Sequence, residues 1–209
     1  MTKFLVVFDV DSTLINDEAI ELLAERAGKR QEVAEVTERA MRGELDFEAS
    51  LRQRVLTLKG LDESVLAEVS QELSPTKGAA ELIAAIHQRG GKAAAVSGGF
   101  IQLLGPVKSK LGFEIERANT LEVVDGKLTG EVVGKVIDRA AKAEALIEWS
   151  EQLEVPIYKT IAVGDGANDL GMMEIAGLSV AFCAKPVVQQ KAKIALNERD
   201  LSLLIQLLP

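Results

Sequence analysis

Cysteine, histidine and aromatic side chains are scarce in this chain of 209 residues. It has one cysteine, Cys183, and one histidine, His87, and aromatic residues make up 4% of it. A lone cysteine cannot close an internal disulfide, and its apolar neighbours in LSVAFCA indicate a reduced core thiol rather than a nucleophile. The sequence therefore excludes a disulfide-based fold, suggests no histidine chemistry, and predicts a cytoplasmic location.

Positive charge and long apolar runs are also lacking. Lys and Arg number 24 against 32 for Asp and Glu, which gives a net charge of -8. Nucleic-acid binding requires a basic surface that this balance does not offer. The N-terminal apolar run covers only residues 4–8, far short of the roughly 18 residues that a membrane span needs. We expect neither nucleic acid nor a membrane as a partner.

What the chain does contain is an alternation of buried strands and helices. Four short runs are apolar on both faces, at residues 4–8, 92–97, 159–164 and 178–182. The segments between them are mostly of helical period, most clearly in GAAELIAAIHQRG and AAKAEALIEWSEQL. This alternation predicts an α/β fold with a doubly wound parallel sheet.

Two segments depart from that alternation. Residues 16–75 contain charged, amphipathic helical text and no convincing strand. The stretch LEVVDGKLTGEVVG has Asp-Gly between β-branched residues, the pattern of a hairpin. We therefore predict a core domain of residues 1–15 and 76–209, an inserted helical cap of residues 16–75 with hinges near Asn16 and Pro75, and a small antiparallel β-hairpin as an appendage.

Reactive side chains follow the predicted strands. Asp9 ends the first run, Ser97 the second, and Asp165 follows the run 159–164, and ligands of open parallel sheets bind at such strand ends. Asp9 and Asp11 would lie on one face, roughly 6.6 Å apart along an extended strand. At an effective dielectric constant near 20 their repulsion is on the order of 2.5 kcal/mol. Such a carboxylate cluster calls for a hard divalent cation, and its oxygen ligands favour Mg²⁺.

The motifs DVDST, SGG and GDGAND, together with a lysine, resemble those of the haloacid dehalogenase superfamily of phosphohydrolases. The resemblance spans the whole chain. More narrowly, FEASLRQRV, AVSGGF, AVGDGANDLGM and AGLSVAFCAKP are similar to segments of the phosphoserine phosphatase family. This resemblance implies a Rossmann-like core under the cap. It also implies an enzyme that hydrolyses O-phospho-L-serine with Mg²⁺ through an aspartyl phosphate, as the last step of serine biosynthesis.

The resemblance also assigns roles to residues of the core. It implies that Asp9 is the nucleophile and that Asp11 is first the general acid and then the base. The metal would take Asp9, the backbone carbonyl of Asp11, and Asp165, with Asp169 supporting its water ligands. The donors expected to meet the charge of the phosphoryl group are Ser97, the Gly98 amide, Lys142 and Asn168.

In the cap, the resemblance assigns the amino-acid part of the substrate to charged and apolar side chains. Glu18 and Arg52 would bind its ammonium and carboxylate groups, a carboxylate and a guanidinium being the complementary pair. Met41 and Phe47 would form an apolar wall around the short side chain. Without the resemblance, we would expect each of these residues to lie on a solvated helix surface or in the core of the cap.

Other functions share parts of this pattern. A signalling receiver domain also combines acidic residues, a phosphoacceptor aspartate, a hydroxyl and a lysine, but it needs no helical insertion and would be labelled once rather than turn over. A phosphomutase, or a phosphatase for another small phosphate monoester, shares every core motif. The sequence leaves open whether the protein is a monomer or a homodimer.

Overall fold

The structure, a computed structural model, describes residues 1–41 and 44–209, and of Met41 it describes only the backbone. Its described residues form one seven-stranded sheet with the order β4-β3-β2-β1-β5-β6-β7. Every neighbouring pair is parallel except β3 with β4. The strands are β1 (Leu5–Phe8), β2 (Lys92–Phe100), β3 (Ile115–Val124), β4 (Lys127–Val133), β5 (Thr160–Gly164), β6 (Leu178–Phe182) and β7 (Ile194–Leu196).

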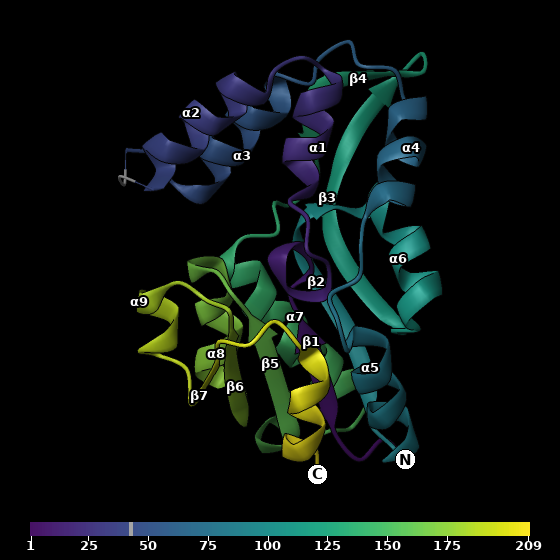
Figure 1. The fold of residues 1–209 in the computed structure, drawn as a ribbon, viewed down its shortest axis with the longest axis vertical. Helices are drawn as coiled ribbons and strands as arrows, with labels where there is room; N and C mark the ends of the chain where they lie inside the picture. The colour runs from purple at the N-terminus through teal and green to yellow at the C-terminus, as the bar shows by residue number, and fades with distance from the viewer. Residues whose placement is uncertain (42–43) are drawn as a thin grey trace.

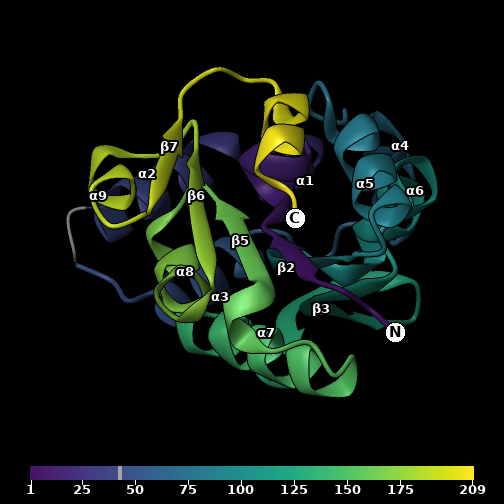
Figure 2. The same ribbon diagram turned by 90° about the horizontal axis from the view of Figure 1, so that it is seen from below.

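Helices cover both faces of the sheet, as the end-on view in Figure 2 shows. Val6 and Phe8 of β1 join the core under α5 and α6, whereas Leu5 and Val7 join the core under α7 and α8. No helix among the described residues is long and apolar enough to cross a membrane. The helices are α1 (Ala19–Arg26), α2 (Arg30–Met41), α3 (Phe47–Leu56), α4 (Ser64–Glu72), α5 (Ala79–Gln88), α6 (Leu104–Leu111), α7 (Arg139–Gln152), α8 (Leu170–Ile175) and α9 (Pro186–Gln189).

The predicted doubly wound α/β sheet is confirmed, and the four apolar runs became β1, β2, β5 and β6. The Asp-Gly hairpin is also present as β3 and β4. It is not a separate appendage, because β3 begins at Ile115 and pairs in parallel with β2 before it turns into the hairpin. The hairpin therefore extends the main sheet at one edge.

Helices α1 to α4 form the region between β1 and α5, at the top of the molecule in Figure 1. The chain enters and leaves this region side by side, because Ile15 forms an antiparallel bridge with Pro75. The Asn16 N–H donates to the Ser74 carbonyl, and the Asp17 carboxylate accepts from the Ser74 N–H at 2.7 Å. These contacts lie where the sequence predicts hinges; the boundaries of the cap domain remain a prediction.

The centre of the sheet positions the site. β1 lies between β2 and β5, so that the chain runs from β1 outward in both directions. Such a reversal of strand order leaves a crevice beyond the carboxyl ends of the central strands. The residues that follow β1 and β5, and those at the end of β2, therefore meet in one place.

Candidate active site

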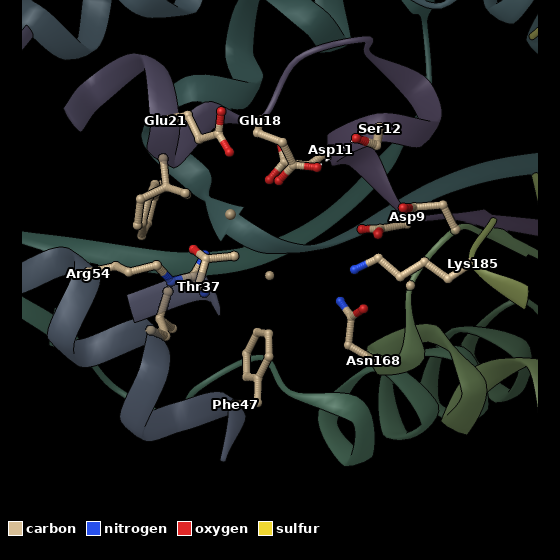
Figure 3. A pocket seen from close by; sticks show the side chains of 17 residues that line it. Asp9, Asp11, Ser12, Glu18, Glu21, Thr37, Phe47, Arg54, Asn168 and Lys185 are labelled. Carbon is tan, nitrogen blue, oxygen red and sulfur yellow. Dashed lines mark hydrogen bonds between the residues drawn. The ribbon is translucent and has the colours of Figure 1, made fainter. Parts of the chain in front are cut away.

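The segment after β1 is a tight, irregular turn. The strand ends at Phe8, and the turn Val10–Leu14 is closed by the Ile15 N–H, which donates to the Val10 carbonyl, while the backbone at Asp11 and Ser12 is not helical and Ser12 has a φ of 56°. The chain therefore does not stay extended through Asp11, and the expected spacing along a strand does not apply. Both Asp9 and Asp11 nevertheless line the same pocket (Figure 3).

A buried lysine joins two of the carboxylates. Lys142, on the first turn of α7, places its Nζ 2.7 Å from Asp9 Oδ1 and 2.6 Å from Asp169 Oδ1. Burial alone would lower the pKa of Lys142, but Asp169 and Asp9 raise it above its ordinary value. Burial, and then the charge of Asp169, raises the pKa of Asp9 in spite of the lysine. Two buried carboxyl groups thus share one buried ammonium group.

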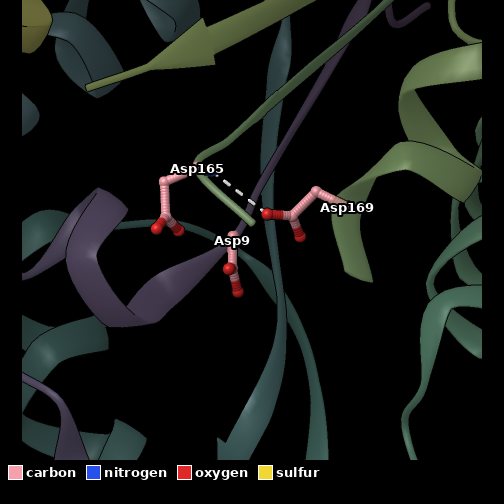
Figure 4. Close-up of side chains that lie close together, drawn as sticks. All are labelled: Asp9, Asp165 and Asp169. Carbon is pink, nitrogen blue, oxygen red and sulfur yellow. Dashed lines mark hydrogen bonds between the residues drawn. The ribbon is translucent and has the colours of Figure 1, made fainter. Parts of the chain in front are cut away.

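Three carboxylates come close enough to share a cation. Oxygens of Asp9, Asp165 and Asp169 lie within 4.8 Å of one another (Figure 4). Both oxygens of Asp169 are engaged, one by Lys142 and the other by the N–H groups of Asp165 and Gly166. Burial, and then Asp169, raises the pKa of Asp165 to about 6. This donor set suits a hard divalent cation, and the hydrogen bonds that Asp169 accepts hold the Asp165 loop in place.

The loop Ser97–Gly99 forms the next wall of the site. Ser97 is buried, and its Oγ accepts a hydrogen bond from the Gly99 N–H at 2.8 Å. Sequence analysis placed Ser97 at the end of a strand, but β2 continues to Phe100 and shifts register after Val96. A Cβ on Gly99 would lie 2.8 Å from Asp11 Oδ2. The loop thus approaches Asp11 at a distance that only glycine permits.

The pocket beyond these residues has a volume of about 410 Å³ and reaches from the core into the helical region. In Figure 3 the Lys185 side chain points into it from one side and Phe47 and Arg54 from α3 face it from the other. Core and helical region touch here, because a Cβ on Gly98 would lie 3.0 Å from the Phe47 ring. The lining residues from the helical region are Glu18, Ile20, Glu21, Thr37, Phe47, Leu51 and Arg54.

Glu18 connects the turn after β1 with the start of α1. Its Oε1 accepts a hydrogen bond from Ser12 Oγ at 2.6 Å. Burial, and then the charge of Glu18, raises the pKa of Asp11 to about 7. The pocket thus contains a carboxyl group that retains its proton close to neutral pH.

The structure places Arg52 outside the pocket, contrary to the expectation from sequence. Its guanidinium binds Glu48 on the same helix at 2.8 Å, and its side chain is 40% exposed. Arg54 lines the pocket instead, and burial lowers its pKa against the nearby charges of Glu18, Asp11 and Glu21. Residues two apart on a helix point about 200° apart, so only one of the two arginines can face the site.

Several pocket residues were not predicted from sequence, among them Ser12, Glu21, Thr37, Arg54, Gly99 and Lys185. For Arg54 a signal existed. Phe47 and Arg54 are seven residues apart and share the helix face that also carries the buried Leu51. Of the other expected residues, Asn168 and Gly98 line the pocket, while the Met41 side chain lies outside the described residues.

Comparison with known proteins agrees with this fold. The family model for haloacid dehalogenase-like hydrolases matches residues 6–174. A phosphoserine phosphatase of Streptococcus thermophilus is 47% identical over 206 residues, which cover 99% of this chain and 96% of the relative. One of Streptomyces coelicolor is 52% identical over 204 residues, but the match covers 98% of this chain and only 50% of that protein, so the chain spans about half of this longer relative.

Solved structures give the same result. A phospho-aspartyl intermediate analogue of phosphoserine phosphatase has a TM-score of 0.94 at 44% identity and covers the whole of both chains. A substrate-bound phosphoserine phosphatase complex also has a TM-score of 0.94, at 43% identity with full coverage. The fold and the site thus define a haloacid dehalogenase-like hydrolase. Within that class, the chain belongs to the phosphoserine phosphatase family.

Proposed function

We propose that this protein hydrolyses O-phospho-L-serine to L-serine and phosphate, with Mg²⁺ as cofactor, as the last step of serine biosynthesis in the cytoplasm. One observation carries the proposal. A single pocket is lined at one end by aspartates and by Gly98 and Gly99, with the buried Lys142 in contact with Asp9, and at the other end by Glu18 and the half-buried Arg54. The first end suits a phosphoryl group, and the second suits an amino acid.

Asp9 is the nucleophile in the proposed reaction. Its Oδ1 accepts from Lys142 and from the Val10 N–H, and no hydrogen bond to its Oδ2 occurs among the described residues. An oxygen of Asp9 forms a bond to phosphorus, and the bond from phosphorus to the serine oxygen breaks. Asp11 gives its proton to that oxygen. Asp11 then takes a proton from the water that attacks phosphorus, which releases phosphate and restores the Asp9 carboxylate.

The remaining groups of the core hold charge in place. Asp9, the Asp11 carbonyl and Asp165 would hold the metal, and Mg²⁺ when bound supplies positive charge against the carboxylates and the phosphoryl oxygens. Lys142 keeps Asp9 oriented and adds a second positive charge in a water-poor site. Ser97, the Gly98 N–H and Asn168 are the donors proposed for the phosphoryl oxygens.

The amino-acid end of the pocket supports phosphoserine over other monoesters. Arg54 presents a planar guanidinium that can bind a carboxylate through two hydrogen bonds, and Glu18 can accept from an ammonium group. Phe47 forms the apolar wall between them and Gly98. This arrangement takes over the carboxylate-binding role that the resemblance assigned to Arg52.

A phosphate-release assay with Mg²⁺ tests the proposal. We expect O-phospho-L-serine to be hydrolysed with the highest kcat/KM in a panel that includes phosphoethanolamine, which lacks the carboxylate, and small sugar phosphates. Chelation of the divalent metal should stop turnover. A preference for sugar phosphates would contradict the substrate, and full activity after exhaustive chelation would contradict the metal.

A further inference from the structure

Asn119 is a buried amide at an irregular point of the sheet. Its side chain is on β3 and the residue is 1% exposed, although asparagine is uncommon in strand interiors. The register between β2 and β3 passes from Val96 with Arg117 directly to Phe100 with Asn119. Residues 97–99 therefore bulge out of the ladder, and β3 cannot hold them through ordinary backbone pairing.

The Asn119 side chain replaces that missing pairing. Its Nδ2 donates to the Gly98 carbonyl at 2.8 Å. On the other side of the same peptide unit, the Gly99 N–H donates to Ser97 Oγ at 2.8 Å. The peptide between Gly98 and Gly99 is thus held at both ends. Ser97 Oγ accepts this bond, and its own O–H group is a further donor beside the pocket-lining Gly98 and Gly99.

The amide oxygen of Asn119 binds the segment just before α7, the helix that carries Lys142. Asn119 Oδ1 accepts from the Ile137 N–H at 2.8 Å. Ile137 precedes Asp138, which caps α7 by accepting from the Ala141 N–H at 2.8 Å. The next residue of that helix is Lys142. One amide therefore connects the bulged loop to the start of the helix that sets the position of Lys142.

We propose that Asn119 is a positioning residue for the phosphoryl group: it fixes the Ser97–Gly99 loop relative to Lys142. The inference rests on the proposed function, since it assumes that this end of the pocket binds phosphate. Misplacement of catalytic donors by about 1 Å can cost on the order of 100-fold in rate. Loss of the amide should therefore impair phosphate binding and turnover, and not stability alone.

Gln102 provides a matched control. Its Nε2 donates to the Leu121 carbonyl at 2.7 Å, and its Oε1 accepts from the Leu121 N–H at 3.2 Å. It is thus also an amide that makes two backbone bonds to β3, but among the described residues its side chain forms no hydrogen bond with the Ser97–Gly99 loop or with the segment before α7. Asn119→Leu and Gln102→Leu each remove one amide with two bonds.

The experiment compares these variants with the wild type at a temperature well below each melting temperature. The readouts are calorimetric binding of inorganic phosphate with Mg²⁺, and kcat and KM for phosphoserine. We expect Asn119→Leu to weaken phosphate binding and lower kcat/KM by about 10- to 100-fold, and Gln102→Leu to keep wild-type constants while it loses thermal stability. If Asn119→Leu does not fold, Asn119→Ser, which is smaller and polar, is tested instead.

Three results can be distinguished. Wild-type phosphate affinity and kcat/KM in a folded Asn119 variant would overturn the inference, as would an equal loss in the Gln102 variant. A wild-type protein that does not hydrolyse phosphoserine would refute the proposed substrate. In that case the binding of inorganic phosphate still decides the role of Asn119.

Discussion

At the scale of single residues, Gly99 sets how closely the loop after Val96 can approach the turn that follows β1. A Cβ there would lie 2.8 Å from Asp11 Oδ2 and 3.0 Å from Ser97 Oγ. We predict that Gly99→Ala folds, since its backbone has no left-handed φ, but loses about 10- to 100-fold in kcat/KM because both side chains must move. Steady-state kinetics and thermal melting test this. Unchanged kinetics would mean that the loop relaxes without cost.

The two arginines of α3 form a natural pair for a second test. Arg54→Ala should raise KM for phosphoserine by the loss of about 2–3 kcal/mol of charge-assisted hydrogen bonding. Its effect on phosphoethanolamine should be small, since that ester has no carboxylate. Arg52→Ala is the control and should be close to wild type, because its exposed ion pair with Glu48 contributes about 1 kcal/mol or less. Equal losses on both esters for Arg54→Ala would indicate a structural role instead.

The sequence predicts some residues of the site and not others. Asp9 and Asp165 follow apolar strands, so their meeting place follows from the rule for parallel sheets, whereas Ser97 lies within β2 where its register shifts. Arg52 and Arg54 differ only in helix phase, which a motif alone does not resolve. Asn119 acts through a bulge in β2, and no local pattern of β3 reveals a bulge in its neighbour.

At the scale of elements, Asp200 attaches the C-terminal turn Leu201–Leu207 to Lys77, in the segment just before α5. Its carboxylate accepts from Lys77 Nζ at 2.8 Å and from the Ser202 N–H and hydroxyl. The hydrogen bond from Lys77, and then those from Ser202, lower the pKa of Asp200 to about 2. A carboxyl with a lowered pKa stabilises the folded state above its unfolded pKa of about 4, and this contribution is lost as pH falls toward 2.

Asp200→Asn should therefore melt below the wild type at neutral pH, and the difference should shrink between about pH 4 and pH 2. Melting curves of both proteins across this range measure it. Other carboxyl groups titrate in both proteins and cancel in the comparison. Lys77→Gln should show the same pH dependence, whereas a difference that stays constant down to pH 2 would refute the ion-pair explanation.

Elements also show where sequence prediction ended. The long helices and the strands that are apolar on both faces were predicted, because burial sets the spacing of their apolar residues. The first four residues of β3, IERA, include two charged residues and are only partly buried, so they give no strand signal. Its pairing is decided by β2 beside it, and the three residues of β7 are likewise too few to show a period.

At the scale of the whole molecule, the helical region is attached to the rest of the protein in two ways. The two segments that connect it to the core pair with each other through the antiparallel bridge between Ile15 and Pro75. In addition, backbone hydrogen bonds attach the loop between α3 and α4 to the hairpin. The Gly60 N–H donates to the Leu128 carbonyl at 2.8 Å, and the Leu128 N–H donates to the Leu61 carbonyl at 2.9 Å. The Glu63 N–H donates to the Gly126 carbonyl at 2.8 Å. Any closure of the helical region over substrate therefore cannot be a rigid movement of all four helices.

We predict instead that closure involves α2 and the first turn of α3, which carry Thr37 and Phe47 into the pocket. Binding a phosphonate analogue of phosphoserine with Mg²⁺ should slow amide hydrogen exchange there, because bound ligand penalises local opening. Exchange in α4 should stay unchanged, since its N-terminal loop is already fixed to β4 and serves as the internal control. Equal slowing in α4 would show that the region closes as one body, which requires the backbone bonds to the hairpin to break. No change in α2 would show that the pocket is already closed without ligand.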